Sequence, residues 1–205
     1  MAFKAPLTRH VTRLFRTATT EQIVAGADWY RDAHEVAAAL AVKNDVTVDI
    51  AAGVIAALSP LNSWGSNVNL AARFLAAGGL HAGYLSMGLA KGRAILAGAP
   101  IEATLNGDKI RNFYRSIITE GAEGVCIDRH AYSLAANTRL PESGMPNLKG
   151  KRYEAVADCY RHAAKILSRE YATAFTAAQV QSVTWTQWRR MWWAEGAFDG
   201  HTVEV

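Results

Sequence analysis

The chain has 205 residues, which suits one domain, or one domain in two lobes, with a sizeable core. Half of the residues are hydrophobic, and this composition excludes a globally disordered chain. The formal net charge of +4 permits binding to nucleic acid without requiring it.

Apolar residues recur at helical spacing and β-branched residues form no alternating runs, so the sequence predicts an all-α fold. The segment 48–58 (VDIAAGVIAAL) is apolar on nearly every side, which predicts a buried central helix. In the first half of the chain we expect helices at 6–16, 19–42 and 48–58. A further helix follows the polar segment 59–67 and ends at about 77, and we also expect a helix at 86–97 and one or two helical turns at 101–105.

In the second half, we expect helices at 109–119, from about 128 onward, at 151–171 and at 176–193, with a loop at 141–151. The helices are expected to form two lobes with a cleft between them, in a single domain. The central lobe spans 48–140, the second lobe combines 1–47 with 141–193, and the tail 194–205 is loosely held.

The last predicted helix is rich in tryptophan. We expect Trp185, Trp188 and Trp192 mostly to seal the core, because their spacing places them on one helix face. Trp193 is a candidate for an exposed contact, and Gln181 and Gln187 are candidates to face the cleft.

Two cysteines, Cys126 and Cys159, are too few for a four-thiolate zinc or iron–sulfur site, and we expect no metal. Their apolar surroundings favour buried free thiols and a reducing, cytoplasmic compartment. The basic start, MAFKAPLTRHVTRLF, lacks the apolar core of a secretory signal. No apolar stretch is long enough to span a bilayer, so we expect no membrane partner.

The segment LNGDK (105–109) predicts a tight turn before a helix, with Gly107 able to adopt a positive φ. The free N–H groups at the start of that helix would suit an anion, and Lys109 would suit a phosphate or a reactive sugar carbon. The alternative is an ordinary corner between two helices with a solvated lysine.

The segment GVCIDRHAYSLA (124–135) places Asp128 where a buried run becomes a helix. The residues between Lys109 and Asp128 suffice for one helix and a return along it, which would bring the two side chains together. A carboxylate beside an ammonium is a plausible catalytic pair. The alternative is that Asp128 is a helix N-cap, and the two interpretations are compatible.

These two segments, together with AALSPLNSW (56–64), resemble the helix-hairpin-helix DNA glycosylase superfamily of the endonuclease III type. In that family a hairpin ends in Gly-x-Lys, and an apolar run with Asp-Thr-His follows at about this distance. Gly107 and Lys109 match the hairpin's end, Asp128 matches the catalytic aspartate, and His130 matches the histidine. The resemblance covers roughly 48–140.

The sequence departs from the family pattern at several positions. The first glycine of the hairpin is missing, Arg129 replaces the threonine, and Leu61-Asn62 stands where the family has glutamine. Many members carry an iron–sulfur cluster, which two cysteines cannot hold, so no cofactor is expected.

The resemblance implies double-stranded DNA with an extruded base as the partner. Asp128 would stabilise positive charge on the sugar or deprotonate an attacking group, and Arg129 would favour its ionised form. Lys109 would attack C1′ or clamp a phosphate.

Further residues are candidates for contacts to DNA, and each has a structural alternative. The candidates to bind phosphate or a base edge, or else to cap helices, are Asn62, Ser63 and Asn67. The candidates to stack on the base, or else to lie in the core, are Trp64, Tyr114 and Trp185. The candidates to contact the DNA backbone, or else to form a solvated face, are Arg111, Arg115, Lys91 and Arg93.

The combination of SPLNSW, GDKIRNFY, IDRHA and QSVTWTQWRR also resembles small phage-encoded relatives that are implicated in hypermodifying thymine. Three hypotheses stay open. The chain is a glycosylase-like enzyme acting on a flipped, modified pyrimidine, or a transferase that attaches an amine or amino acid to an activated 5-hydroxymethyluracil. The third hypothesis is a non-catalytic DNA-binding protein.

Overall fold

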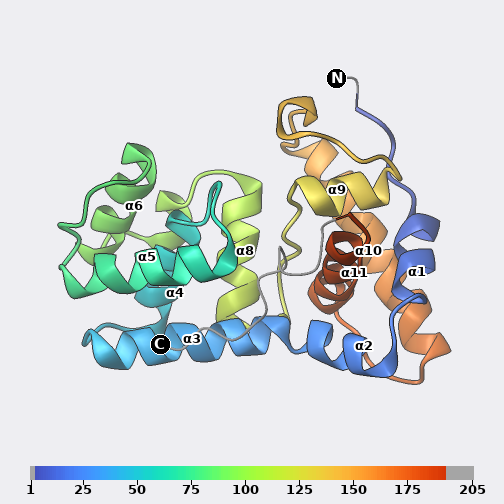
Figure 1. Cartoon of the computed structure of the whole chain (residues 1–205), viewed down its shortest axis with the longest axis horizontal. Coiled ribbons are helices and arrows are strands. Elements are labelled where there is room, and N and C mark those ends of the chain that lie inside the picture. Colours follow the sequence, from blue (N-terminus) through green and yellow to red (C-terminus); the bar gives the residue numbers. More distant parts are fainter. Residues whose placement is uncertain (1–2, 193–205) are drawn as a thin grey trace.

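The structure is a computed structural model that describes residues 3–192, and these residues fold into helices and the loops that join them (Figure 1). No β-strand occurs between residues 3 and 192, which confirms the predicted all-α fold. The helices are α1 (Thr8–Phe15), α2 (Thr20–Ala27), α3 (Trp29–Lys43), α4 (Val48–Ala57), α5 (Trp64–Ala76), α6 (Ser86–Leu96), α7 (Ile101–Thr104), α8 (Asp108–Ile118), α9 (Arg129–Ala135), α10 (Lys151–Glu170) and α11 (Ala177–Trp192), with a 3₁₀ turn, η1 (Glu142–Gly144), before α10.

The predicted helix at 19–42 is wrong in one respect, because the chain forms two helices there. Thr19 and Gln22 start α2 with a reciprocal capping box, but the helix ends at Ala27 and α3 begins at Trp29. The main partners of the two helices differ: α2 packs mainly against α11, whereas α3 packs mainly against α4 and α8 and contacts α11 less extensively. The break therefore lets neighbouring segments serve two separate packing surfaces.

The described residues contain two hydrophobic cores. The first core is built around α3, α4, α5, α6 and α8, with α4 buried from Ala51 to its end as predicted. The second core is built around α1, α9, α10 and α11. Figure 1 shows the two groups of helices side by side, with α2 and α3 running along the edge of both.

The boundaries between the two cores along the chain differ from the lobe boundaries expected at 48 and 140. Helix α3 belongs to the first core, because Ala33, Ala37 and Leu40 form one buried face against it. Helix α9 belongs to the second core, where Tyr132 and Ala135 are buried. The chain therefore joins the second core before Asp128, whereas we expected this change only after residue 140.

The tryptophans of α11 have three different environments, although they were expected mostly to seal the core. Trp188 is buried in the second core, whereas Trp192 is 41% exposed and Trp185 is only half-buried. Trp193 and the tail 194–205 lie outside the described residues. Each helix within 3–192 is too short or too polar to cross a lipid bilayer.

Candidate active site

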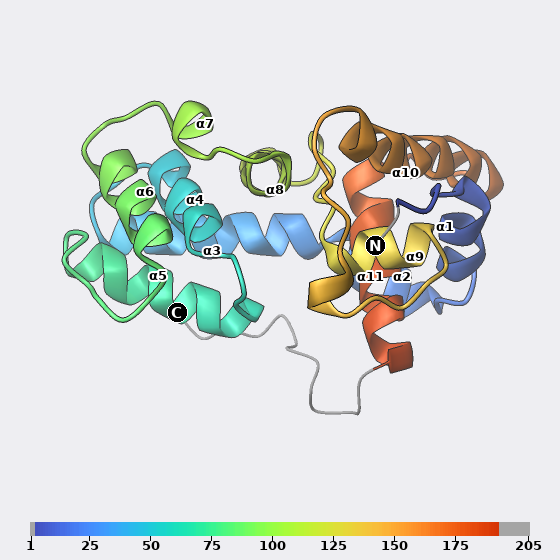
Figure 2. The same ribbon diagram turned by 90° about the horizontal axis from the view of Figure 1, so that it is seen from above.

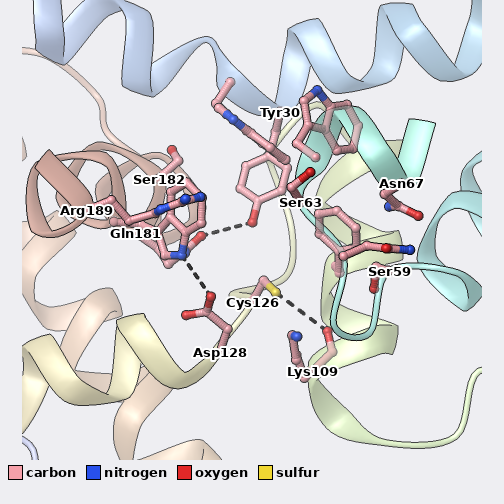
Figure 3. Close-up of a pocket in the computed structure, with 15 residues that line it drawn as sticks. Tyr30, Ser59, Ser63, Asn67, Lys109, Cys126, Asp128, Gln181, Ser182 and Arg189 are labelled. Carbon is pink, nitrogen blue, oxygen red and sulfur yellow. Dashed lines mark hydrogen bonds between the residues drawn. The ribbon is translucent and has the colours of Figure 1, made fainter. Parts of the chain in front are cut away.

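A cavity of about 130 Å³ is lined by residues from both groups of helices. Seen from above, α8 lies between the α4–α6 group and the α9–α11 group (Figure 2). The walls come from the start of α3, the turn before α5, the inner face of α8, the segment before α9 and one face of α11 (Figure 3). Segments that are far apart in the sequence therefore meet at this cavity.

Asp128 lines the cavity and holds both of its carboxylate oxygens in hydrogen bonds. The buried run Val125–Ile127 ends at Asp128, whose extended backbone makes it the N-cap of α9. Oδ1 accepts the Ala131 N–H at 2.8 Å, so the predicted cap is confirmed. Oδ2 accepts the indole N–H of Trp185, also at 2.8 Å. The second hydrogen bond is not part of the cap.

Lys109 lines the same cavity, at the start of α8. Gly107 is the N-cap of this helix and has a φ of 106°, which side-chain-bearing residues rarely adopt. The sequence spacing predicted that Lys109 and Asp128 lie close together, and both residues line this one cavity.

Cys126 lies between these two groups. Its buried thiol donates to the Lys109 carbonyl at an Sγ···O distance of 3.8 Å. Burial raises the pKa of the Cys126 thiol to about 12; the Lys109 ammonium opposes the rise and the Asp128 carboxylate adds to it. One thiol thus lies within electrostatic reach of both Lys109 and Asp128.

Aromatic rings form the wall on the side of the first core. The ring centroid of Trp29 lies 5.0 Å from that of Trp64 and 6.1 Å from that of Phe113. All three side chains are half-buried and line the cavity. The Tyr30 hydroxyl donates to Gln181 Oε1 at 2.9 Å, and burial raises the pKa of Tyr30 well above its ordinary value. The cavity therefore offers flat apolar surface with polar groups at its edge.

The predicted polar residues of the α4–α5 turn line the cavity and also make local hydrogen bonds. Asn62 Nδ2 donates to the Leu58 carbonyl at 2.9 Å, and Ser63 caps α5. Asn67 Nδ2 donates to the Ile55 carbonyl at 3.1 Å. Its Oδ1 is buried, and no described residue donates to it. The capping interpretation is therefore correct for Ser63, and Asn67 keeps an acceptor without a protein partner.

One face of α11 completes the cavity, and sequence reasoning largely missed it. Gln181, Trp185 and Arg189 follow each other at four-residue spacing, and Ser182 lies beside them. The Arg189 guanidinium carbon lies 4.8 Å from the centroid of the Trp185 ring. A polar and aromatic stripe at this spacing was the available signal; Trp185 was a candidate for base stacking or for the core, and Arg189 was not a candidate. Gln181 faces the cavity as predicted, and Gln187 does not line it.

Several predicted site residues lie outside the cavity wall. Arg111 pairs with Asp108 at 2.9 Å, and Arg129 Nη2 lies 3.4 Å from His130 Nε2. The His130 ring lies nearly perpendicular to the Trp185 ring, with 6.1 Å between the ring centroids. The predicted residues that do not line the cavity are Lys91, Arg93, Gly107, Arg111, Tyr114, Arg115, Arg129 and His130.

Tyr114, a candidate to stack on a base, is buried in the first core instead, with its hydroxyl donating to Asp49 at 2.8 Å. Arg115 forms an ion pair with Glu102, and Arg93 donates to the Gly79 carbonyl. These partners bind both arginines to the protein's own surface. Within residues 3–192, no three His, Cys, Asp or Glu side chains gather as a metal site would require.

Comparison with known proteins gives one match. A family model described as a family of unknown function (DUF7178) matches residues 2–191, which include every residue of the cavity. No curated protein and no solved structure matches the chain.

Proposed function

Since the chain belongs to this family of unknown function, we propose its function from the cavity: it is a DNA-binding enzyme that acts on a flipped, modified pyrimidine. A base inside a duplex is out of reach of a side chain, so an enzyme that acts on it must take it out of the stack. The cavity between the two groups of helices is our candidate for the pocket that receives it.

One observation carries this proposal: Lys109 and Asp128 line the same cavity, beside the rings of Trp29, Trp64 and Phe113. Flat aromatic rings stack on any nucleobase, because every base has a π-face. An amine and a carboxylate beside that surface are the groups that chemistry at the glycosidic carbon requires.

The reaction that we propose breaks the bond between C1′ and the base nitrogen. As the base leaves with the bonding electrons, positive charge develops on the sugar, and the fixed Asp128 carboxylate stabilises it. If Lys109 is the nucleophile, its neutral amine attacks C1′, and the base leaves with the bonding electrons and takes one of the two amine protons. The C1′–O4′ bond then breaks, O4′ takes the second proton, and the Nζ lone pair completes a Schiff base between Nζ and C1′. If water attacks instead, Lys109 holds a phosphate and no covalent intermediate forms.

We also propose that α7, the turn at Asn106-Gly107 and α8 form a shortened helix-hairpin-helix that binds the DNA backbone. Helix α8 has no side-chain cap at its start, so its first N–H groups are available to a phosphate. Lys109 follows within the first turn and adds positive charge there. The approach of this turn to DNA would present the cavity to the extruded nucleotide.

Borohydride trapping tests the proposal. Duplexes containing uracil, 5-hydroxymethyluracil, oxidised bases or an abasic site are incubated with the wild type, Lys109→Gln, Asp128→Asn and the control Lys43→Gln. Lys43 is an exposed lysine at the end of α3 and does not line the cavity. We expect a covalent adduct with wild type and control, none with Lys109→Gln, and much less with Asp128→Asn.

Other outcomes separate the alternatives. Base release without an adduct would retain the glycosylase and make Lys109 a phosphate clamp. A gain in DNA mass that requires an amine donor would replace cleavage by group transfer onto activated 5-hydroxymethyluracil. Tight DNA binding with no chemical change, unaffected by Asp128→Asn, would overturn the enzyme proposal.

A further inference from the structure

We propose that α11 contributes a positioning residue to this site: Trp185 fixes the direction of the Asp128 carboxylate, and Arg189 fixes the Trp185 ring. The inference rests on the proposed function, since it concerns how the same carboxylate is held for catalysis. It adds to that function a helix that lies outside the segment, 48–140, covered by the resemblance to the endonuclease III type.

The second hydrogen bond of Asp128 exceeds what a helix cap needs. A cap needs one oxygen, and serine, threonine or asparagine supplies it about as well as aspartate. Here Oδ1 makes the cap with Ala131, and Oδ2 receives the indole N–H of Trp185, a residue 57 positions away. An asparagine would bring an N–H donor, instead of an acceptor, against the indole N–H. The pairing with Trp185 therefore favours aspartate at this position over the other capping residues.

Two hydrogen bonds at different oxygens hold the plane of the carboxylate. An ionised carboxylate has about four lone-pair directions, so two remain after Ala131 and Trp185 are bound. Because Asp128 lines the cavity, these directions serve a group bound there. A fixed acceptor stabilises developing positive charge without reorganising at the moment of reaction.

The Trp185 ring is itself held in place. The Arg189 guanidinium lies over the ring at 4.8 Å, and the His130 ring packs nearly perpendicular to it, with 6.1 Å between the ring centroids. A guanidinium over an indole is a favourable cation–π arrangement. Arg189 therefore stabilises the ring position from which the indole N–H reaches Asp128.

Helix α11 is also anchored beside the cavity, which sets where Trp185 lies. Ser182 donates to the Gly26 carbonyl of α2 at 2.6 Å, and the Tyr30 hydroxyl of α3 donates to Gln181 at 2.9 Å. These bonds lie one turn before Trp185 on the same face of the helix. The register of α11 against α2 and α3 is thus transmitted to the catalytic carboxylate.

The test compares Trp185→Phe with the control Trp188→Phe. Phenylalanine keeps a ring for Arg189 but removes the N–H, whereas Trp188 is a buried tryptophan of the same helix that does not line the cavity. With the base-release assay, we expect Trp185→Phe to lower kcat by about 10- to 100-fold with KM changed less than about two-fold, because a misaimed group loses rate and not substrate binding. Trp188→Phe should leave both constants near the wild-type values.

A second measurement needs no activity. We expect the indole N–H of Trp185 to exchange slowly with solvent in NMR spectra of the wild type. It should exchange faster in Asp128→Ser, which keeps a cap but removes the second acceptor. If the wild type is active and Trp185→Phe has the same kcat, the positioning role of Trp185 is overturned. The same holds if Asp128→Ser leaves the exchange rate of the indole N–H unchanged. Neither outcome would overturn the proposed function. A wild type inactive on all DNA, with the indole response intact, would overturn the proposed function.

Discussion

Only one of the two polar side-chain atoms of Asn67 has a hydrogen-bond partner among the described residues. Its amide nitrogen donates to the Ile55 carbonyl in the last turn of α4, while its oxygen is buried without a donor among the described residues. A buried unpaired acceptor costs about 1–3 kcal/mol. The fold keeps this cost at a residue that lines the cavity, as expected where a bound group supplies the donor.

We expect Asn67→Ala to lower the free energy of unfolding by about 1 kcal/mol, because the Ile55 carbonyl loses its side-chain donor and a void replaces the amide, while removal of the unpaired Oδ1 offsets part of this loss. The measurement is urea unfolding followed by circular dichroism. Asn69→Ala is the matched control, because Asn69 is exposed on the same helix. Equal effects of the two substitutions would contradict a specific role for the hydrogen bond to Ile55.

Cys126 allows a chemical prediction at the same scale. Because burial raises its pKa to about 12, the thiol is protonated at about pH 8 and is shielded from reagents. In a Cys159→Ser background, we expect native protein to resist a thiol-specific reagent and to react once urea unfolds it. Rapid labelling of the native protein would mean that the thiol is open to solvent.

At the scale of elements, substitution of glycine by alanine is expected to have opposite effects on stability at two positions. A Cβ on Gly26 of α2 would lie 2.7 Å from the Val183 Cα of α11, so the helices approach too closely for a side chain. A Cβ on Gly65 of α5 would meet nothing within 4 Å. We expect Gly26→Ala to destabilise by about 1–3 kcal/mol and Gly65→Ala to stabilise by about 0.5–1 kcal/mol.

Thermal unfolding of both variants measures this contrast. Gly26→Ala should also disturb the cavity, because it moves α11, whereas Gly65→Ala should leave the proposed DNA binding unchanged. A stabilised Gly26→Ala protein would show that α2 and α11 can separate without cost.

The helices were largely predictable, and the places where prediction failed have a common cause. The apolar face of α4 and the Asp128 cap follow from local sequence, and both were predicted. The break at Asp28 follows from tertiary packing, since the main packing partners of α2 and α3 differ. Periodicity continues across such a break and gives no sign of it.

Only part of the candidate site was predictable, because local sequence does not show which distant segments meet in the fold. Lys109 and Asp128 are 19 positions apart, so one helix and its return were enough to bring them together. Trp29 and Arg189 are separated from them by much of the chain, and no local pattern distinguishes a tryptophan in a cavity wall from one in a core. Trp185 satisfies both descriptions, being half-buried and hydrogen-bonded to Asp128.

At the scale of the whole molecule, buried tyrosines predict sensitivity to alkali. Burial is the main cause that raises the pKa of Tyr30, Tyr114, Tyr153 and Tyr160 above the ordinary value of 10.0. Above about pH 10 the unfolded chain releases phenolic protons that the native protein retains, so stability falls as pH rises. Below pH 10 the stability contributed by the buried tyrosines is fully present. Burial of the Cys126 thiol also makes stability fall as pH rises, starting from the ordinary thiol pKa of 9.0.

We therefore expect the urea midpoint to decline from about pH 9 upward. Tyr160→Phe, compared at each pH with its own value at about pH 8, should decline less steeply than the wild type. Tyr171→Phe is the control, because Tyr171 is exposed. An equally steep decline in Tyr160→Phe and in the wild type would contradict a contribution from this buried hydroxyl.

The position of α11 in the chain has a consequence for protein synthesis. The ribosome completes α3 to α8, and with them most of the first core, long before it makes Gln181, Trp185 and Arg189. A nascent chain can therefore bury much of its apolar surface while one wall of the cavity does not yet exist. Under the proposed function, the half-made protein carries Lys109 and Asp128 but lacks the helix that aims the carboxylate, so its reactivity toward DNA arises only when α11 docks.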